Sequence, residues 1–350
     1  MVKKKIFVNG YSLSSQKISG VGRYLEKLLK NKNVNFDIVV EKEIYTDKEK
    51  NNLIFKKRGR TKLQKILFNL FAFNGLKPKA IHNVALDFSI HSIFCKSIYT
   101  IHDLCFLSNS GWYTLYERIY LRVNLFLIVH FSSKIITVSE NTKKDLLKYY
   151  PKIAGKVKTV YIPLNISQMT IRDPHKIIQK FDLDNSKYFI SPTNKHPRKN
   201  LHNTIQGFKD SIYFRKGYKL VLTGEGEINS PSIINTNHIS ELEYLTLLKF
   251  SEGIIYFPYY EGFGVPILEC IENKIPILLS NNSSLAELFE NEGLMCNIFE
   301  NSDGITSFLN EFYTKNLAEK TLKQLDLIKY KFNPSTIEDE ITRIYEETFC

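Results

Sequence analysis

The sequence predicts an α/β protein built from two domains, each with a parallel sheet. Short apolar runs rich in β-branched and aromatic residues alternate with helical patterns in both halves, as is typical of parallel strands covered by helices. A length of 350 residues is enough for two domains of ordinary size. The expected strands are residues 5–9, 37–40, 97–101, 134–138 and 157–162, then residues 188–191, 219–223, 253–257 and 275–280. We therefore expect two Rossmann-like domains, residues 1–165 and 166–330, that face each other across a cleft.

Composition narrows the class of protein. Hydrophobic residues make up 43% of the chain and aromatic residues 13%, which fits a folded globular protein. The five cysteines are scattered without a Cys-x-x-Cys pair, so we expect a reduced cytoplasmic protein without a zinc site or disulfide framework. No signal-peptide pattern opens the sequence, and the most apolar helical run, from Ile119, contains Arg122 and Asn124 and is too short to span a bilayer.

The excess of basic over acidic residues lies entirely in the first half of the chain. Residues 1–165 hold 29 Lys and Arg against 11 Asp and Glu, whereas residues 166–350 hold 19 against 25. The segment from Lys56 to Lys79 contains eight basic residues and no acidic one, and Leu63, Leu67 and Leu70 recur within it at helical spacing. This pattern predicts a basic amphipathic helix on an anionic membrane surface, with an ordinary solvated surface helix as the alternative. No nucleic-acid-binding module accompanies it, so no nucleic acid partner is expected.

The segment YYEGFGVPILECIENKIPILLS, residues 259–280, follows one expected strand and contains two acids. Gly262 and Gly264 allow backbone angles that other residues avoid, and Pro266 suits the first turn of a helix that begins near Val265. The unpaired amides and positive dipole end of that helix would favour a phosphate. Glu261 precedes this anion site and Glu269 lies about one turn inside the helix. The simpler alternative is that Glu261 caps or stabilises the start of the helix and Glu269 is solvated.

Two further motifs follow expected strands of the first half. ISGVGRYLEKLL places Gly20 and Gly22 before an amphipathic helix, where the backbone could approach a phosphate, although such a pair is more often only a turn. SIYTIHDLCF places His102 and Asp103 at a strand end that points to the predicted cleft. A single histidine is more often structural, so both interpretations of His102 stay open.

Basic residues follow the first strand of the second half. SPTNKHPRKNL supplies Lys195, Arg198 and Lys199 before a helix that begins near Asn200. Cations beside a helix N-terminus suit a diphosphate, since both supply positive potential to the same oxygens. The next strand ends at Gly224 in KLVLTGEGE, which is a less specific signal.

These motifs together resemble glycosyltransferase family 4, the retaining nucleotide-sugar transferases of GT-B fold. SGVGRYLEKLL, TIHDL, ITVSENTKKDL, HPRKNL, LVLTGEGE and EGFGVPILE occur in the family's order and approximate spacing, and the last is the most specific. The resemblance implies that Glu261 contacts the transferred sugar, Lys199 neutralises the diphosphate and His102 lies near the reacting sugar. It implies that Glu269 binds the ribose hydroxyls. The implied donor-binding positions are Gly20, Gly22, Thr193, Arg198, Gly262, Phe263, Gly264, Val265 and Glu269.

The sequence departs from the family pattern at one strand end. Many members carry Gly-Arg where this chain has Pro192 and Thr193, so the second diphosphate cation comes from Arg198 or Lys195 or is missing. The family's C-terminal helix returns to the first domain, a role that residues 331–350 suit. We expect Ser335 or Thr336 to cap that helix, which carries an apolar stripe of Ile337, Ile341 and Ile344.

The resemblance implies a retaining, mannosyltransferase-like enzyme. The expected donor is a GDP- or UDP-linked hexose, and the acceptor is a glycan or a polyprenyl-diphosphate-linked glycan in bacterial surface polysaccharide (O-antigen or capsule) assembly. The basic first half places the protein at the inner face of the cell membrane. No cofactor or metal is expected, because the implied arrangement does not require one. Asp182 and Asp184 have the Asp-x-Asp spacing by which other transferases hold a divalent ion, but they lie beside a predicted linker. The alternatives are a nucleotide-sugar epimerase or a sugar phosphorylase of the same fold, or a non-catalytic basic membrane-binding protein.

Overall fold

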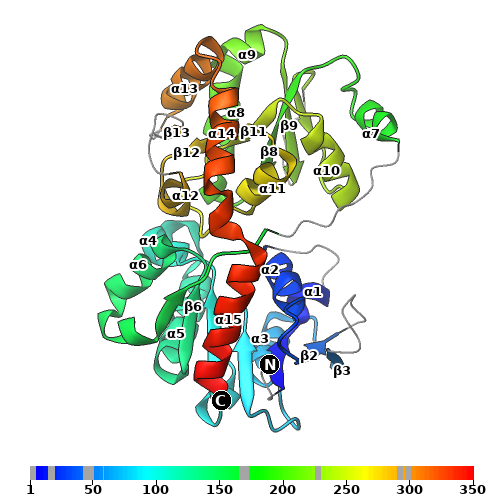
Figure 1. Cartoon of the computed structure of the whole chain (residues 1–350). Helices are drawn as coiled ribbons and strands as arrows, with labels where there is room; N and C mark the ends of the chain where they lie inside the picture. The colour runs from blue at the N-terminus through cyan, green and yellow to red at the C-terminus, as the bar shows by residue number, and fades with distance from the viewer. Residues whose placement is uncertain are drawn as a thin grey trace. The chain divides into compact units, whose positions relative to one another are not determined.

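A computed structural model describes residues 5–14, 20–41, 51–57, 59–164, 173–224, 230–289, 295–296 and 301–350. The chain divides into two compact units (Figure 1). Unit 1 comprises Met1–Asn165 and Phe332–Cys350, and unit 2 comprises Ile166–Lys331. Among the described residues, no helix is both long and apolar enough to cross a membrane.

The sheet of unit 1 is parallel throughout its described part. Its strand order is β3-β2-β1-β4-β5-β6-β7, so the order reverses direction between β1 and β4. The strands are β1 (Ile6–Asn9), β2 (Phe36–Val40), β3 (Asn52–Phe55), β4 (Ala80–Asn83), β5 (Lys96–Ile101), β6 (Lys134–Thr137) and β7 (Val157–Thr159).

Amphipathic helices cover the sheet of unit 1. They are α1 (Tyr11–Ser14), α2 (Gly20–Leu29), α3 (Lys62–Leu70), α4 (Cys105–Ser108), α5 (Leu115–Phe131), α6 (Glu140–Tyr149) and α15 (Pro334–Phe349), with 3₁₀ turns η1 (Ile90–Ile93), η2 (Ser110–Trp112) and η3 (Pro151–Lys156). A further 3₁₀ turn, η5 (Lys329–Phe332), contains the point at which the chain passes from unit 2 back to unit 1. Thr61 is the N-cap residue of α3 and Thr114 that of α5, and each forms a capping box.

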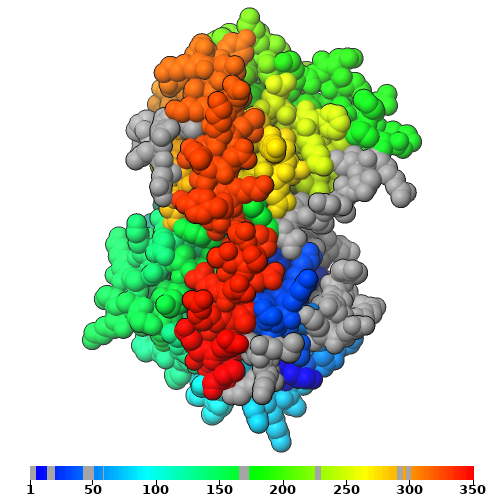
Figure 2. Space-filling view, viewed as in Figure 1, coloured from blue at the N-terminus to red at the C-terminus, as the bar shows by residue number. Residues whose placement is uncertain are grey.

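The C-terminal helix α15 packs on unit 1 as the sequence predicts. Ile337, Ile341 and Ile344 are buried along its inner face. Figure 2 shows the side chains of α15, in red, as a band along the visible face of this unit, beside the blue residues near the N-terminus. The Asn31 side chain, just after α2, donates to the Glu338 carbonyl oxygen at 3.2 Å and joins the two helices.

The cap of α15 differs from the expected one. Asn333 is the N-cap residue, and its side-chain oxygen accepts hydrogen bonds from the backbone amides of Ser335 and Thr336. The expectation that Ser335 or Thr336 caps the helix is therefore wrong. Pro334 occupies the first helical position, where its missing N–H costs nothing, so the helix begins two or three residues earlier than expected.

The sheet of unit 2 is also parallel throughout its described part. Its strand order is β10-β9-β8-β11-β12-β13, with the reversal between β8 and β11. The strands are β8 (Tyr188–Thr193), β9 (Lys219–Gly224), β10 (Ile233–Asn235), β11 (Gly253–Tyr256), β12 (Ile277–Ser280) and β13 (Met295–Cys296).

Helices enclose the core of unit 2 against both faces of this sheet. They are α7 (Pro174–Lys180), α8 (Leu201–Asp210), α9 (Ile212–Arg215), α10 (Glu241–Lys249), α11 (Val265–Asn273), α12 (Ser283–Leu288), α13 (Asp303–Thr314) and α14 (Ala318–Ile328), with the 3₁₀ turn η4 (Pro197–Lys199). Phe189 on β8, Phe208 on α8 and Phe308 on α13 meet in one buried cluster. This apolar cluster fixes the strands whose carboxyl ends carry the candidate site.

The structure adds four strands that the apolar runs do not predict. These are β3, β4, β10 and β13. Each has only two to four residues, and β4 ends in His82 and Asn83, so no apolar alternation long enough for a strand assignment exists.

Candidate active site in the second unit

The strand order of unit 2 locates a binding site before any side chain is considered. Ligands of open parallel sheets bind beyond the carboxyl ends of the strands, at the point where the strand order reverses. In unit 2 this point lies between β8 and β11. The segments that leave these two strands are η4 with α8, and residues 257–264 with α11. The basic motif and the first acid of the acidic motif therefore meet at one edge of the sheet.

Glu261 forms the centre of this edge and binds two cations. Its Oε1 lies 2.5 Å from Lys199 Nζ, and its Oε2 lies 3.4 Å from Arg198 Nη1. Lys199 Nζ also donates to the Tyr256 hydroxyl at 2.8 Å. Because Gly264, and not Glu261, is the N-cap residue of α11, the alternative that Glu261 caps this helix is wrong.

Charge is concentrated in this cluster. Burial alone would raise the pKa of the Glu261 carboxyl, but the Lys199 and Arg198 cations lower it below its usual value, so Glu261 is ionised. Burial, and next the Glu261 charge, raise the pKa of the Tyr256 hydroxyl well above its usual value. Two cations against one carboxylate leave the cluster with a net positive charge, which suits an anionic ligand.

The start of α11 is shaped for close approach of a ligand. Gly264 has φ +96°, a left-handed conformation that favours glycine, and the helix begins at Val265 with Pro266 in its first turn. Pro266 has no amide and the Ile267 amide donates to the Gly264 carbonyl oxygen at 2.9 Å, so the donors that this turn can offer lie at Val265 and before it. The helix dipole makes this end positive. Gly262 and Phe263 precede this turn. The sequence prediction of a helix beginning near Val265 is confirmed.

Two serines of α12 hold the loop that carries Glu261. The Glu261 amide donates to Ser283 Oγ at 2.9 Å, and the Ser284 hydroxyl donates to the Glu261 carbonyl oxygen at 2.9 Å. No sequence motif assigned a role to these residues. The only signal was their place in SNNSSLAEL, directly after an apolar strand.

The two loops at the switch point are also bonded to each other. Asn200 is left-handed, with φ 53°, and its side chain donates to the Phe257 carbonyl oxygen at 3.0 Å. The Tyr259 amide donates to the Arg198 carbonyl oxygen at 2.8 Å. These bonds fix the backbone from which the cations extend, so the ion pairs form on a rigid frame.

Glu269 is buried, so the simpler alternative, in which Glu269 is solvated, is wrong. Only 4% of the residue is exposed, and its Oε2 accepts a hydrogen bond from the Tyr244 hydroxyl at 2.5 Å. Tyr244 lies on α10, far from the motif in sequence, and no sequence pattern pointed to it. Among the other expected positions, Thr193 directs its hydroxyl to the adjacent Asn194 carbonyl oxygen, and Lys195 is exposed.

The expected site residues of the first half lie in unit 1. Gly20 and Gly22 form the first turn of α2. His102 follows β5, and its Nε2 lies 3.0 Å from the Val84 carbonyl oxygen, which can only accept, so Nε2 carries the proton and Nδ1 is an acceptor. Burial lowers the pKa of His102 to about 4, so the ring is neutral near pH 7.

A buried hydrogen-bond chain lies behind His102. His82 on β4 bonds the Tyr345 hydroxyl of α15 at 2.6 Å and the Thr100 hydroxyl at 2.8 Å. Tyr24 of α2 also reaches Thr100, at 3.2 Å, and its ring packs edge-on to His102 at 5.0 Å. Burial, with the nearby His102, lowers the pKa of His82 to about 3. The chain thus ties the C-terminal helix to the strand end that carries His102.

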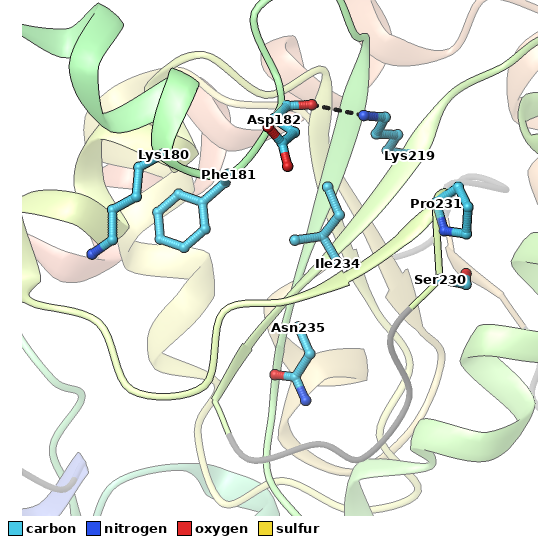
Figure 3. A pocket seen from close by; sticks show the side chains of 8 residues that line it. All are labelled: Lys180, Phe181, Asp182, Lys219, Ser230, Pro231, Ile234 and Asn235. Atoms are coloured by element: carbon cyan, nitrogen blue, oxygen red, sulfur yellow. Dashed lines mark hydrogen bonds between the residues drawn. The ribbon is translucent and has the colours of Figure 1, made fainter.

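A separate pocket of unit 2 lies away from this edge. Figure 3 shows it between the end of α7, the start of β9 and strand β10, with Lys219 Nζ donating to the Asp182 carbonyl oxygen at 2.7 Å. It is bordered by the edge strand and contains no residue of the Glu261 cluster. Within the described parts of the chain, no group of three or more His, Cys, Asp or Glu residues could hold a metal ion.

Mannosyltransferases resemble part of this chain in sequence. No protein-family model matches the chain. It is 23% identical over 217 residues to the O-antigen chain mannosyltransferase B of Escherichia coli, covering 57% of each chain. It is 30% identical over 158 residues to the alpha-1,3/1,6-mannosyltransferase ALG2 of Kluyveromyces lactis, covering 44% of this chain and 31% of that one. The chain therefore spans about half, or less, of the length of these relatives.

Solved structures resemble the whole chain. The HepE protein of Anabaena, in complex with UDP and glucose, has a TM-score of 0.78 at 14% identity and covers 98% of this chain and 100% of its own. Sucrose-phosphate synthase of Thermosynechococcus elongatus has a TM-score of 0.75 at 13% identity, with 99% of each chain covered. WaaG, a glycosyltransferase involved in lipopolysaccharide biosynthesis, has a TM-score of 0.70 at 12% identity, covering 97% and 99%. The fold is therefore the two-domain α/β fold of the GT-B type.

Proposed function

We propose that this chain is a glycosyltransferase that moves a sugar from a nucleotide-diphosphate sugar to a glycan or lipid-linked acceptor in bacterial surface polysaccharide synthesis. The observation that carries the proposal is the Lys199, Arg198 and Glu261 cluster at the switch point of unit 2. The O-antigen mannosyltransferase relative supports a mannose-type sugar. The UDP complex of HepE supports a nucleotide-linked donor, with UDP or GDP as the candidates.

Each group of the cluster has a role in this proposal. Lys199 and Arg198 neutralise the donor diphosphate, and the amides of residues 262–265 bind phosphate and sugar oxygens. Glu261 holds both cations in place and accepts from a sugar hydroxyl, while Glu269, fixed by Tyr244, accepts from ribose hydroxyls. The protein itself supplies the positive charge, so the proposal calls for no cofactor or metal ion.

The proposed reaction retains the configuration of the sugar, as in family 4. The acceptor oxygen bonds to the anomeric carbon on the face that the nucleotide leaves. The bond from that carbon to the diphosphate breaks, and its electron pair goes to the diphosphate. A diphosphate oxygen takes the acceptor proton. Since negative charge grows on the diphosphate in this step, most of the catalysis is electrostatic stabilisation by Lys199 and Arg198.

Binding of a nucleoside diphosphate tests the donor site directly. We expect one of UDP, GDP, CDP or dTDP to stabilise the protein by about 2.7 kcal/mol at one hundred times its Kd, seen as a thermal shift. The shift should be reduced in Glu269→Ala and kept in Glu319→Ala, which removes an exposed glutamate of α14. If no nucleotide stabilises the folded protein, the proposed donor site is wrong. Sugar release that needs inorganic phosphate and no nucleotide would indicate a phosphorylase instead.

We further infer that unit 1 docks on an anionic membrane through α3 and α5. Leu63 and Leu67 of α3 are 65% and 44% exposed, and Ile119, Val123 and Phe126 form an exposed stripe along α5. Such contiguous apolar exposure is uncommon on a protein that meets only water. The two helices adjoin, because Lys62 of α3 lies 5.6 Å from the centre of the Tyr116 ring of α5.

Basic residues of the predicted cluster, Lys56 to Lys79, lie beside these apolar side chains, but Lys56 has a different role. Lys62 and Lys65 are exposed beside the apolar residues. Lys56, in contrast, donates to the carbonyl oxygens of Ala72 and Asn74 at 2.9 and 2.7 Å, and burial lowers its pKa, so it supports the end of α3. Arg58, part of the predicted basic cluster, lies outside the described residues.

Replacing the two exposed lysines tests the docking surface. Each basic residue near an anionic membrane contributes about 1 kcal/mol, so Lys62→Gln with Lys65→Gln should weaken binding to phosphatidylglycerol-containing liposomes roughly tenfold or more. The control replaces two exposed lysines of unit 2, Lys216 and Lys323, with glutamine. Equal liposome flotation of both double variants would remove the membrane inference.

A further inference from the structure

We propose that Tyr256 is a positioning residue that bridges Lys199 and Glu261 when the donor diphosphate draws Lys199 away from Glu261. Tyr256 ends β11, one of the two strands at the switch point of unit 2. The residue is only 3% exposed, and its hydroxyl lies within the charged cluster. No motif of the sequence pointed to this tyrosine, and the proposed reaction assigns it no step.

The Tyr256 hydroxyl can accept one hydrogen bond and donate another. Lys199 Nζ lies 2.8 Å from the hydroxyl oxygen, and an ammonium group can only donate, so the oxygen accepts. Burial, and next the Glu261 charge, raise the pKa of Tyr256 well above its usual value, so the hydroxyl keeps its hydrogen at neutral pH. Glu261 is the partner for that hydrogen, because its carboxylate acts on Tyr256 both as a charge and as a hydrogen-bond acceptor.

Glu261 needs such a partner when the donor binds. Its Oε1 is paired directly with Lys199 at 2.5 Å, and a diphosphate competes with Glu261 for the same ammonium group. Arg198 Nη1 lies 3.4 Å from Oε2, which is longer than the roughly 2.7–3.2 Å of an ordinary N–H···O bond. The Glu261 side chain is only 9% exposed, and a buried charge that loses its partner is strongly destabilised. A hydrogen bond from Tyr256 would keep Glu261 paired and in place.

The tyrosine also limits how far Lys199 can move. The Lys199 ammonium lies 4.9 Å from the centre of the Tyr256 ring, within the range of a cation–π contact, while it donates to the hydroxyl. A small shift of Lys199 towards the diphosphate therefore lengthens its pair with Glu261 and keeps its bond to Tyr256. The direct ion pair becomes a pair bridged by a neutral hydroxyl, which leaves more of the ammonium charge for the diphosphate. This inference rests on the proposed function, in which Lys199 neutralises the donor diphosphate.

A double-mutant cycle on the full chain tests whether Tyr256 serves Glu261 or only Lys199. Lys199→Met removes the ammonium from Glu261, so Tyr256→Phe should lower the urea midpoint of unfolding in Lys199→Met at least as much as in wild type. A smaller fall in Lys199→Met would overturn the bridge, because Tyr256 would then act only through Lys199. Tyr188→Phe is the control, since Tyr188 on β8 is also buried and its hydroxyl donates to the Leu247 carbonyl oxygen at 2.8 Å. Its effect should be equal in both backgrounds.

Transfer kinetics add a result that a purely structural role would not produce. Tyr256→Phe should lower kcat roughly tenfold or more, because a hydrogen bond to a charged group is lost, and should leave the KM of the donor within about twofold. Tyr188→Phe should leave both values unchanged. An unchanged kcat in Tyr256→Phe would overturn the bridge, including when Lys199→Met is too unstable for the unfolding cycle. The cycle needs neither nucleotide nor activity, so it decides whether Tyr256 holds Glu261 even if no sugar transfer is found and the proposed function fails.

Discussion

Lys199→Ala is expected to lower the rate of sugar transfer by roughly 10²- to 10³-fold, the usual cost of removing one group that stabilises growing negative charge. Lys199 Nζ is held by the Glu261 carboxylate at 2.5 Å and by the Tyr256 hydroxyl at 2.8 Å, so the ammonium is fixed before the donor binds. A fixed charge needs little reorganisation when charge develops on the diphosphate. The measurement is single-turnover transfer with the donor identified by nucleotide binding, compared with Lys216→Ala, which removes an exposed lysine of the same unit.

The ion pair itself complicates this variant and suggests a second one. The Lys199 and Glu261 side chains are only 13% and 9% exposed, and breaking a buried pair typically destabilises a protein by about 3–5 kcal/mol. The double variant Lys199→Met with Glu261→Gln removes both charges, so we expect it to recover most of the stability of Lys199→Ala but none of the rate. Recovery of the rate as well would mean that Lys199 serves only to neutralise Glu261.

The candidate site of unit 2 was accessible from the sequence because its signals are local. Gly264, Pro266 and the apolar run before them predict a strand, a turn and a helix start without knowledge of any distant residue. The same holds for Lys199, which directly precedes the cap of its helix. The rule that parallel strands carry their ligand sites at their carboxyl ends places both motifs at one edge of the sheet, but the ion pair between Arg198 and Glu261 was not predicted.

The parts that could not be predicted depend on contacts between distant segments. Tyr244 reaches Glu269 from another helix, and the Lys56 ammonium is bound by carbonyl oxygens beyond α3. Strand β4 was missed because its residues, AIHN, do not alternate as a longer strand would. Without β4 the switch point of unit 1 cannot be located. The exposed apolar stripe of α5 could not be predicted either, because an apolar helix pattern in a sequence does not show which face of the helix is covered.

Among Gly207, Gly217, Gly224, Gly253 and Gly264 of the second unit, Gly224→Ala is expected to cause the largest loss of stability. Gly224 ends β9 with φ +136°, a conformation that residues with a side chain rarely adopt. A Cβ atom there would lie 2.0 Å from the Thr193 carbonyl oxygen of the neighbouring strand β8. A strained backbone angle costs about 1–3 kcal/mol, and overpacking adds about 1–3 kcal/mol, so the combined loss is roughly 2–6 kcal/mol. The backbone oxygen cannot move without shifting Thr193, which stands at the edge of the site.

Two other glycines separate the two causes. Gly217 has φ +80°, and a Cβ atom added there would meet no atom within 4 Å, so Gly217→Ala carries only the cost of the backbone angle. Gly155 has neither a positive φ nor a close neighbour, so Gly155→Ala should be nearly neutral. We expect the urea midpoint of unfolding to fall slightly for Gly217→Ala and far more for Gly224→Ala. Nucleotide binding should weaken only in Gly224→Ala, because only this substitution strains β8, the strand that precedes Arg198 and Lys199. Equal midpoints for Gly217→Ala and Gly224→Ala would show that β8 can shift at Thr193 without loss of stability. The inference that Lys199 and Arg198 extend from a rigid backbone would then be wrong.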